Sequence, residues 1–528
     1  MVKSFFSFLI LCLLGTTSLK AQSYTVSSIE KTDKEGMQYE ILGKVGERYW
    51  VFKNNEGIST IAQFNAQMLM VKQNDLAFLP KQLNGLEFVT FSDKVFVVYQ
   101  FQVNTTVYAA LAQINTDGQL VGTPKILDTA EKIRPGSGTK VFNLLQSDDH
   151  QKVILFSVNT TKANALKVRT IALNNNFEVT GGSEFSVQSS NKKSALSDFA
   201  LDNAGNLFCL RNVTQTNAAP AVSLIFLSAN GTEVVESPVI NNSLLLDNIR
   251  LTVDNGKNRI LLNSFYATEK KGHVEGLYSY VWEVSTRKEL FTNANRFTDA
   301  VRTAVAQKRN IKDAFDACYV DKISSQADGS YVVVAEQAES YVNHNSFSRW
   351  DYYYGGAFYN PFMFNYWNRP FGFYPWARMG WGMGWGGGMN PWMMRPWGNP
   401  FASYGYPSVT YNADKIALLS FDKNGSLQWA KTIDKSQSDQ NVDQFIGYGT
   451  IQNKEGVQFL FHDKQKGVHF LAINALSQQG ELMKGASIMT SEKNYEWMPR
   501  MLKQVGDHEA ILPYQYKSKI GFAKVQFK

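Results

Sequence analysis

The chain has 528 residues, of which 44% are hydrophobic and 19% are charged. This is the composition of a globular protein rather than of a chain that is disordered throughout. The net charge of +7 comes from 53 basic and 46 acidic residues spread along the sequence, so we expect no nucleic-acid partner, which would require a clustered basic stretch.

The N-terminus has the features of a secretory signal peptide. Lys3 precedes the apolar run Phe5 to Leu14, and small and polar residues then lead to Ala21, after which we expect cleavage. The run is too short to span a bilayer, and no later stretch offers about eighteen continuous apolar residues, so we expect no transmembrane span. Residues 1–21 are interpreted as a signal peptide. The mature chain is expected in the periplasm, at the outer-membrane periphery or outside the cell.

After this leader, one unit recurs about every fifty residues: two inner strands around a turn, followed by an outer hairpin. The outer hairpins alternate apolar and polar residues around a short polar turn, as in KIALLSFDKNGSLQWAKTI from Lys415. Four-stranded units repeated radially form a β-propeller. We therefore predict an all-β fold in which residues 22–528 form a single propeller of seven or eight four-stranded blades. The predicted unit starts are near Gln38, Leu86, Lys140, Leu196, Asn248, Ala317, Gln444 and Trp497.

Three features lie outside the regular unit. The last unit supplies three strands, so Tyr24 to Glu30 is predicted to add the fourth and to close the ring. Asp299 to Phe315 has helical spacing and lies between two units. Cys209 and Cys318 are far apart in apolar stretches, and we interpret them as buried thiols rather than as a disulfide.

The turn FDKNGSLQW contains Asp422, Gly425 and Trp429, and it is similar to the D-x-x-G-x-x-x-W signature of quinoprotein-type propeller repeats. The resemblance implies the fold only, because the other hairpins lack the Trp and no quinone-binding residues match. No cofactor is expected. Together with the leader, the repeats look like those of secreted propeller proteins of Bacteroidota-type bacteria.

The sequence contains no linear catalytic or metal-binding motif. The Asp/Asn/Gly turns lack the bidentate Glu of a calcium loop, and we interpret them as hairpin turns. The six histidines are scattered without ligand spacing, so no metal site is expected. Asp198, Asp321 and Asp443 recur at the starts of inner strands, where we expect solvated strand ends. They leave open an alternative function: an enzyme of the hydrolase or lyase class with its active site in the central funnel.

Residues 350–406 contain twenty-one aromatic residues, eleven glycines and six methionines, but no Val, Ile or Leu. Rings spaced by Gly and Pro leave voids, so this segment cannot build an ordinary core. We interpret residues 346–408 as an aromatic, Gly- and Met-rich insertion within the sixth unit. Methionine sulfur suits monovalent copper, but the residues do not form a Met-x-x-Met array, and we interpret them as contact residues.

The leading interpretation is a non-catalytic exported scaffold that contacts a protein, glycan or membrane partner through this insertion. Tryptophan rings stack on sugars, anchor protein contacts and lie at membrane interfaces. No catalytic residue is assigned, and a low-complexity segment without a partner remains open. The predicted binding residues are Trp367, Trp376, Trp381, Trp385, Trp392 and Trp397.

Overall fold

The computed structural model describes the chain from residue 23 to residue 527, with gaps. The gaps are residues 32–36, 56, 137, 139, 161–164, 188–193, 214–220, 240–243, 270–271, 307–309, 343–344, 347–408, 441–443, 486 and 490–493. The predicted signal peptide and all of the predicted insertion except Ser346 therefore lie outside the described residues.

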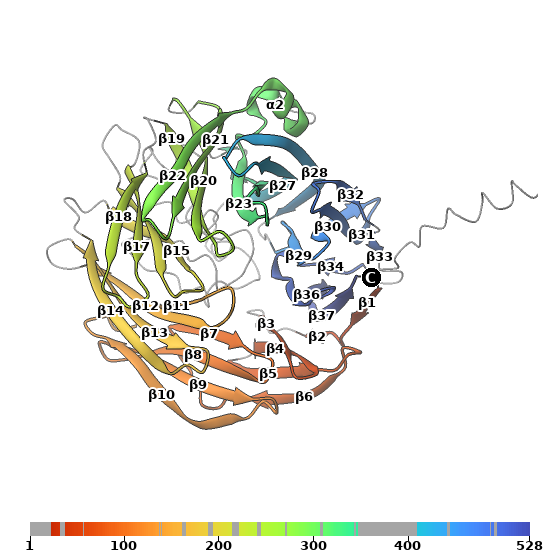
Figure 1. Cartoon of the computed structure of the whole chain (residues 1–528). Helices are drawn as coiled ribbons and strands as arrows, with labels where there is room; N and C mark the ends of the chain where they lie inside the picture. The colour runs from red at the N-terminus through yellow and green to blue at the C-terminus, as the bar shows by residue number, and fades with distance from the viewer. Residues whose placement is uncertain are drawn as a thin grey trace, which may run out of the picture.

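Eight antiparallel sheets radiate from a central axis as the blades of a propeller, which confirms the all-β prediction and gives eight blades (Figure 1). In blades 1 to 5 the four strands follow one another outward from the axis in chain order. Blade 1 contains β3 (Gln38–Val45), β4 (Arg48–Asn55), β5 (Ile58–Phe64) and β6 (Met70–Asp75); blade 2 contains β7 (Gly85–Thr90), β8 (Lys94–Val103), β9 (Thr106–Asn115) and β10 (Leu120–Ala130). Blade 3 contains β11 (Phe142–Gln146), β12 (Lys152–Thr160), β13 (Leu166–Asn174) and β14 (Val179–Val187); blade 4 contains β15 (Ser194–Leu201), β16 (Leu207–Val213), β17 (Ala221–Leu227) and β18 (Val234–Val239).

The second half of the ring repeats this plan with additional short strands. Blade 5 contains β19 (Leu245–Asp254), β20 (Arg259–Ala267), β21 (Gly276–Glu283) and β22 (Lys288–Arg296); blade 6 contains β23 (Cys318–Ser325), β24 (Tyr331–Gln337), β25 (Glu339–Val342), β26 (Asn345–Ser346), β27 (Val409–Phe421) and β28 (Leu427–Gln440). Blade 7 contains β29 (Gly449–Asn453), β30 (Gly456–Gln465), β31 (Val468–Ser477), β32 (Leu482–Lys484) and β33 (Ile488–Met489); blade 8 contains β34 (Glu496–Trp497), β35 (Lys503–Gly506), β36 (Glu509–Tyr516), β37 (Lys519–Gln526), β1 (Ser23–Val26) and β2 (Glu30–Lys31). All predicted unit starts lie within a few residues of an inner strand.

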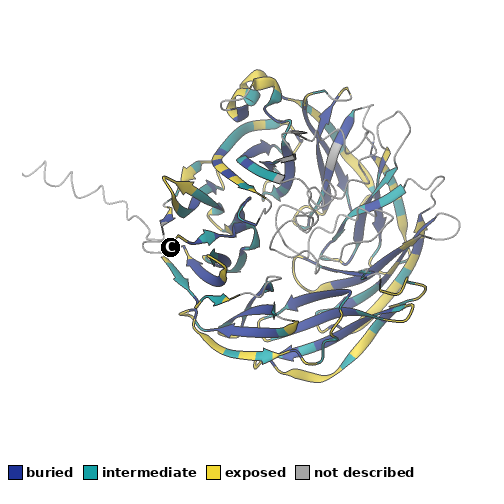
Figure 2. Ribbon diagram, turned by 180° about the vertical axis from the view of Figure 1, so that it is seen from behind, coloured by how far each residue is buried: buried dark blue, intermediate teal, exposed yellow. Residues whose placement is uncertain are grey.

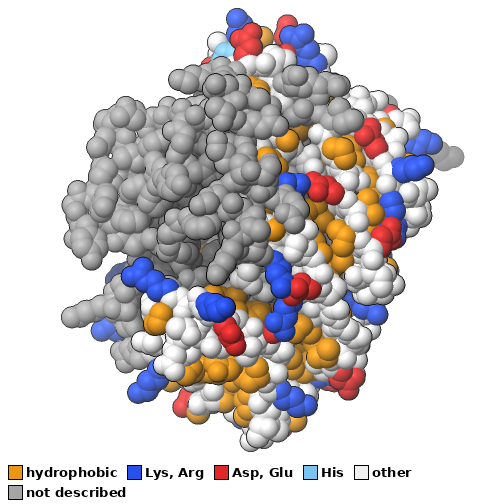
Figure 3. All heavy atoms as spheres, turned by 90° about the vertical axis from the view of Figure 1, so that its left-hand side faces the viewer, with side chains coloured by type: hydrophobic (Ala, Val, Ile, Leu, Met, Phe, Trp, Pro, Cys, Tyr) orange, Lys and Arg blue, Asp and Glu red, His pale blue; other side chains and the backbone are white. Residues whose placement is uncertain are grey.

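The middle strands of the blades are buried on both faces, whereas the outer strands are not (Figure 2). Every residue of β20 and β24 is buried, while β6 has only exposed and half-buried positions and β18 has one buried residue, Val239 at its end. Continuous apolar runs therefore mark the strands that lie between two blades, and alternating runs mark the rim. Figure 3 shows the ring from the side, and on this outer surface hydrophobic side chains lie among charged ones. Exposed side chains on the outer strands include Leu120, Ile126, Val179 and Val234.

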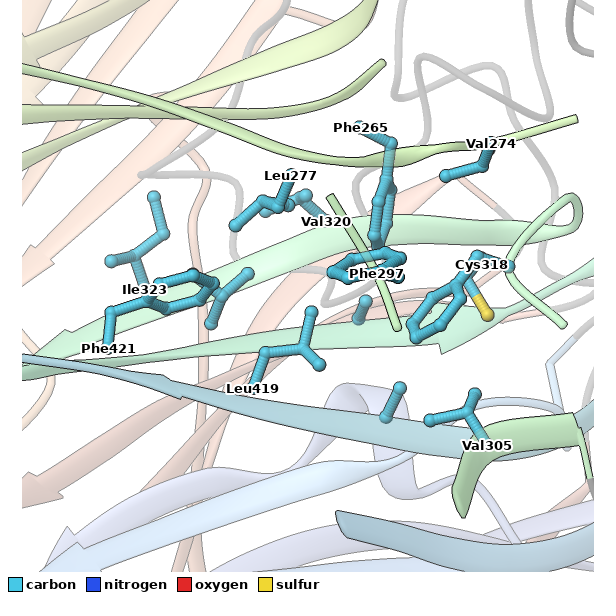
Figure 4. Packing of buried hydrophobic residues seen from close by; sticks show 14 of the residues in the cluster. Phe265, Val274, Leu277, Phe297, Val305, Cys318, Val320, Ile323, Leu419 and Phe421 are labelled. Carbon is cyan, nitrogen blue, oxygen red and sulfur yellow. The ribbon is translucent and has the colours of Figure 1, made fainter. Parts of the chain in front are cut away.

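The core consists of eight hydrophobic layers, one between each pair of neighbouring blades. In the layer between blades 5 and 6, Phe265 and Phe297 pack against Phe315, with a distance of 4.2 Å between the ring centroids of Phe297 and Phe315 (Figure 4). Cys318 is buried in the same layer, and both Cys209 and Cys318 are free thiols, as predicted. Because each sheet covers its neighbour, no blade needs a core of its own.

The two ends of the described chain close the ring in blade 8 (Figure 1). β1 pairs antiparallel with β37, from Ser23 opposite Gln526 to Val26 opposite Ala523, as predicted. Ser27 continues the connection: its N–H donates to the Phe522 carbonyl at 2.9 Å, and its Oγ accepts from the Phe522 N–H at 3.0 Å. Both ends of the chain are thus held in one sheet.

The predicted helical segment lies between blades 5 and 6. It contains helix α2 (Asp299–Ala306) and the 3-10 helix η1 (Ile311–Asp313), and blade 8 contains a second 3-10 helix, η5 (Pro499–Met501). None of the described helices is long and apolar enough to cross a membrane.

The predicted hairpin turns are confirmed. Asp422 Oδ1 accepts hydrogen bonds from the Asn424 and Ser426 N–H groups of its own turn, at 2.9 and 2.8 Å, and Gly425 has φ +78°. Asp202 bonds the Asn206 N–H in the same way at 2.7 Å. These carboxylates hold the hairpin turns through hydrogen bonds to backbone N–H groups.

Candidate functional site

The predicted insertion is flanked by hydrogen-bonded neighbours in blade 6. β24 pairs with β27 from Tyr331 opposite Phe421 to Glu336 opposite Ile416, and β25 extends the ladder to Val342 opposite Val409. β26 ends at Ser346, and β27 begins at Val409. The chain therefore leaves and re-enters the propeller side by side, between the second and third long strands of the blade.

The predicted insertion leaves blade 6 at one end of the propeller. Because successive strands run in opposite directions, the connections between second and third strands, and those from one blade to the next, lie at the same end of the ring. We call this end the insert face. Its described parts near blade 6 belong to the connections 267–276, 296–318, 337–409, 440–449 and 465–468.

A buried polar network fixes the base of the insertion. Glu336 on β24 and Lys435 on β28 form an ion pair with both side chains fully buried. Desolvation lowers the pKa of Lys435, and the adjacent Glu336 carboxylate opposes that shift. Breaking such a pair leaves an uncompensated buried charge, so the pair ties the two strands together.

Gln437 extends the network from blade 6 to blade 7. Its Oε1 accepts from the Gly447 N–H at 2.8 Å, and its Nε2 donates to the Gly447 carbonyl at 3.0 Å and to the His462 carbonyl at 2.8 Å. Gly447 has φ +94°, and a Cβ there would lie 2.1 Å from Nε of Arg500. Arg500 lies in η5, with Nη2 3.9 Å from Oε2 of Glu336. The positive φ favours glycine at position 447, and blades 6, 7 and 8 meet there.

A histidine pair lies beside this network on blade 7. His462 Nε2 is 2.9 Å from His469 Nδ1, and the two rings stack with 5.0 Å between their centroids. Phe445 meets the His462 ring edge to face. Burial, and then the neighbouring His469 and Lys464, lowers the pKa of His462 to about 3. Burial also lowers the pKa of His469, so both imidazoles are neutral near pH 7.

The inner-strand aspartates form pairs between blades. Asp198 lies within the register shift of β15 and has φ +50°; its Oδ1 is 3.5 Å from Nη1 of Arg250 on blade 5. Arg250 in turn donates from Nε to the Val320 carbonyl of blade 6 at 3.1 Å. Asp321 sits in the bulge of β23 and accepts a hydrogen bond of 2.5 Å from the Tyr448 hydroxyl of blade 7. A bulge re-aims the side chain, and here it aims the carboxylate at the next blade.

These positions correct one prediction. Asp321 was expected at a solvated strand end, but it is buried, with 2% relative exposure, because Tyr448 and the adjoining blade cover it. The Asp198 side chain has 14% exposure and is also paired. Asp443 lies outside the described residues, so the three aspartates cannot be compared as one set.

The tryptophans predicted to bind a partner, Trp367, Trp376, Trp381, Trp385, Trp392 and Trp397, all lie outside the described residues, as do the methionines of the insertion. The groups that the structure does bring together, Glu336 with Lys435 and His462 with His469, were not singled out from the sequence. The sequence signal that could have found the ion pair is a charged residue inside an apolar strand, as Glu336 is in YVVVAEQ. Among the described residues, one group of three has metal-ligand character: His273, Asp313 and Asp316.

Comparisons with known proteins return no match to a family model and none to a curated protein. Solved structures with a similar arrangement include a prolyl endopeptidase (TM-score 0.38, 8% identity, covering 94% of this chain and 55% of that one). Others are a polysaccharide lyase, the PL25 ulvan lyase (TM-score 0.34, 9% identity, covering 82% and 90%), and the Synechocystis apocarotenoid oxygenase (TM-score 0.31, 10% identity, covering 97% and 95%). The chain thus spans about half the length of the prolyl endopeptidase. Similarities this weak carry no argument about activity.

Proposed function

We propose that this chain is an exported, non-catalytic β-propeller that serves as an interaction scaffold in the bacterial envelope or outside the cell. Its contact element is the insertion, residues 346–408, and its partner is a protein, a glycan or a membrane interface. The observation that carries the proposal is the contrast between the segment's composition, seven of the chain's eleven tryptophans without a Val, Ile or Leu, and the rigid ladder that flanks it.

Exposing many aromatic rings to water is unfavourable, and this supports the proposal that a partner covers them. Leaving apolar area in water costs on the order of 25 cal/mol for each Å². Only Asp351, Arg369, Arg378 and Arg395 are charged between Trp350 and Tyr406, so long-range attraction by charge is weak and ring contacts dominate. Apolar surface of this kind marks interaction sites on exported proteins.

The non-catalytic assignment is supported by how the inner-strand acids are used. Asp198 and Asp321 pair with Arg250 and Tyr448 of neighbouring blades. An enzyme in the funnel needs acids or bases that are free to reach a substrate. In our proposal these two carboxylates hold blades together, so Asp321→Asn lowers stability and leaves partner retention unchanged in the folded protein.

The proposal is tested with a variant in which Trp367, Trp376, Trp381, Trp385, Trp392 and Trp397 are all replaced by Ser. The matched control is Trp429→Ser, which removes a ring that packs on the outer rim of blade 7, where a Cβ on Gly480 would lie 2.8 Å from it. Both proteins are compared with the unaltered protein for retention by immobilised envelope proteins, by cell-envelope polysaccharide and by phospholipid vesicles.

We expect the unaltered protein and the Trp429 control to be retained in one of the three assays, and the sixfold variant to be lost from it by at least about tenfold, because anchor rings dominate such contacts. The assay that responds identifies the class of partner. Equal retention of the sixfold variant, or no retention of the unaltered protein in any assay, contradicts the proposal.

A further inference from the structure

A histidine and two aspartates converge on the insert face, at the junction of blades 5 and 6. His273 Nδ1 lies 2.6 Å from Asp316 Oδ2 and 3.3 Å from Asp313 Oδ1. The three ligand atoms all lie within 4.8 Å of one another, and the side chains are partly open to solvent.

The backbone on both sides of this group is fixed by buried neighbours. His273 precedes Val274, and Asp313 and Asp316 flank Ala314 and Phe315; the three apolar residues are buried in the layer between blades 5 and 6. Figure 4 shows Val274 and Cys318, which follow closely after His273 and Asp316, in that packed layer. The positions of the three polar side chains are thus set by the core beneath them.

Hydrogen bonds join the two segments directly. The Val274 N–H donates to Asp316 Oδ1 at 2.8 Å, which leaves Oδ2 directed at the imidazole. Arg302 of α2 donates from Nη2 to the Val274 carbonyl at 2.8 Å and from Nη1 to the Lys312 carbonyl at 3.2 Å. Its guanidinium therefore fastens the backbone of both segments through these two carbonyl groups.

The charges of the group are not balanced within the described part of the chain. Neither Asp313 nor Asp316 forms an ion pair with a described lysine or arginine, and their shared partner is an imidazole that carries charge only when protonated. Two carboxylates this close repel each other, and a cation between them removes the repulsion.

We propose that His273, Asp313 and Asp316 form a binding site for a divalent transition-metal cation of the zinc type. One imidazole nitrogen and two carboxylate oxygens are ligands that zinc takes, and three protein ligands leave a coordination position for water. Calcium, which takes six to eight oxygen ligands, is a poor match for a set that contains an imidazole. The proposal is independent of the partner-binding role of the insertion.

A metal at this site acts as a clamp. It joins the 267–276 connection of blade 5 to the 296–318 connection that leads into blade 6, and blade 6 carries the insertion. Binding to the folded chain alone stabilises it in proportion to the logarithm of the metal concentration. The clamp is therefore expected to raise the melting temperature when zinc is added.

The test is calorimetric titration of the full mature protein, stripped with EDTA, with zinc chloride and separately with calcium chloride. The informative variants are His273→Ala and Asp313→Asn, since Asp313 takes no part in the bond to the Val274 N–H. The matched control is His469→Gln, which removes one member of the His462–His469 pair. Melting curves without metal establish that each variant is folded.

We expect one zinc ion per unaltered chain, no comparable calcium binding, and an unchanged affinity in His469→Gln. His273→Ala and Asp313→Asn should each weaken zinc binding by at least roughly tenfold to a hundredfold, because even residues that only support a ligand have effects of that size. Equal zinc affinity in these two variants, or the absence of saturable binding to the unaltered protein, shows an adventitious ion only and overturns the proposal.

Discussion

The propeller ring and the predicted insertion differ in the residues that accompany their aromatic side chains in the sequence. In the ring, Trp282 is fully buried beside Phe208 and Phe226, among the branched aliphatic side chains of blades 4 and 5. Residues 350–406 hold twenty-one aromatic residues and no branched aliphatic partner. Close packing needs side chains of different shapes. The difference teaches that an aromatic ring stabilises a fold only where smaller side chains fill the space around it, and it is the reason why we propose the insertion as a contact element.

The largest expected effect is the loss of stability when a buried tryptophan of the ring is removed. Trp282→Ala removes a ring that touches two blades and whose Nε1 donates to Ser237 Oγ at 3.1 Å. We expect the free energy of unfolding to fall by about 3–5 kcal/mol. Urea denaturation measures it. Trp385→Ala in the insertion is the matched substitution and is expected to change stability by less than about 0.5 kcal/mol; a loss comparable to that of Trp282→Ala would contradict the distinction.

A second prediction concerns the joint between the two regions. Lys435→Met removes the cation paired with the buried Glu336 carboxylate and leaves the more distant Arg500, whose Nη2 lies 3.9 Å from Oε2, so we expect a loss of about 3–5 kcal/mol in unfolding free energy. The double variant Lys435→Met with Glu336→Leu removes both charges and should recover a substantial part of that loss. If the single and double variants were equally destabilised, packing rather than charge pairing would hold the base of the insertion.

A smaller expected effect is the dependence of stability on pH through His462, which lies beside the base of the insertion. His462 has a folded-state pKa of about 3, below the ordinary value of 6.5 expected in the unfolded chain. The unfolded chain therefore binds more protons between these values, so stability is fully present above about pH 6.5 and falls as the pH decreases toward 3, by up to about 1.4 kcal/mol per pH unit.

The measurement is urea denaturation at pH 7 and pH 5 of the unaltered protein, of His462→Gln and of the control His508→Asn. The unaltered protein and the control should lose more stability on acidification than His462→Gln does. An identical loss in all three proteins would mean that His462 is not the group responsible.

Much of the ring is predictable because its signals are local. Each unit start precedes an apolar run and a turn with at least one Asp, Asn or Gly, and the deficit of one strand in the last unit indicates that Tyr24 to Glu30 pairs with β37. The helical spacing from Asp299 likewise predicts α2, although the segment changes to a 3-10 turn at Ile311.

The buried pairs, Asp321 with Tyr448 between blades and Glu336 with Lys435 within blade 6, could not be predicted, because their members are far apart in sequence. Asp321 and Tyr448 are 127 positions apart, and Glu336 and Lys435 are 99 positions apart. Which side chains meet depends on the inner-strand bulge and on how one blade packs against the next. The cluster of His273, Asp313 and Asp316 could not be predicted for the same reason. Its members come from two separate connections and show no metal-binding spacing in the sequence.

The most direct test of whether the ring supplies stability and the insertion supplies binding replaces residues 347–408 with a short Gly-Asn turn between β26 and β27. The melting temperature is measured, together with retention in the assay that retains the unaltered protein. We predict that melting stays within about 2 °C of the full mature protein while retention is lost. A shortened protein that melts far lower, or that is retained as well as the full one, would contradict the account.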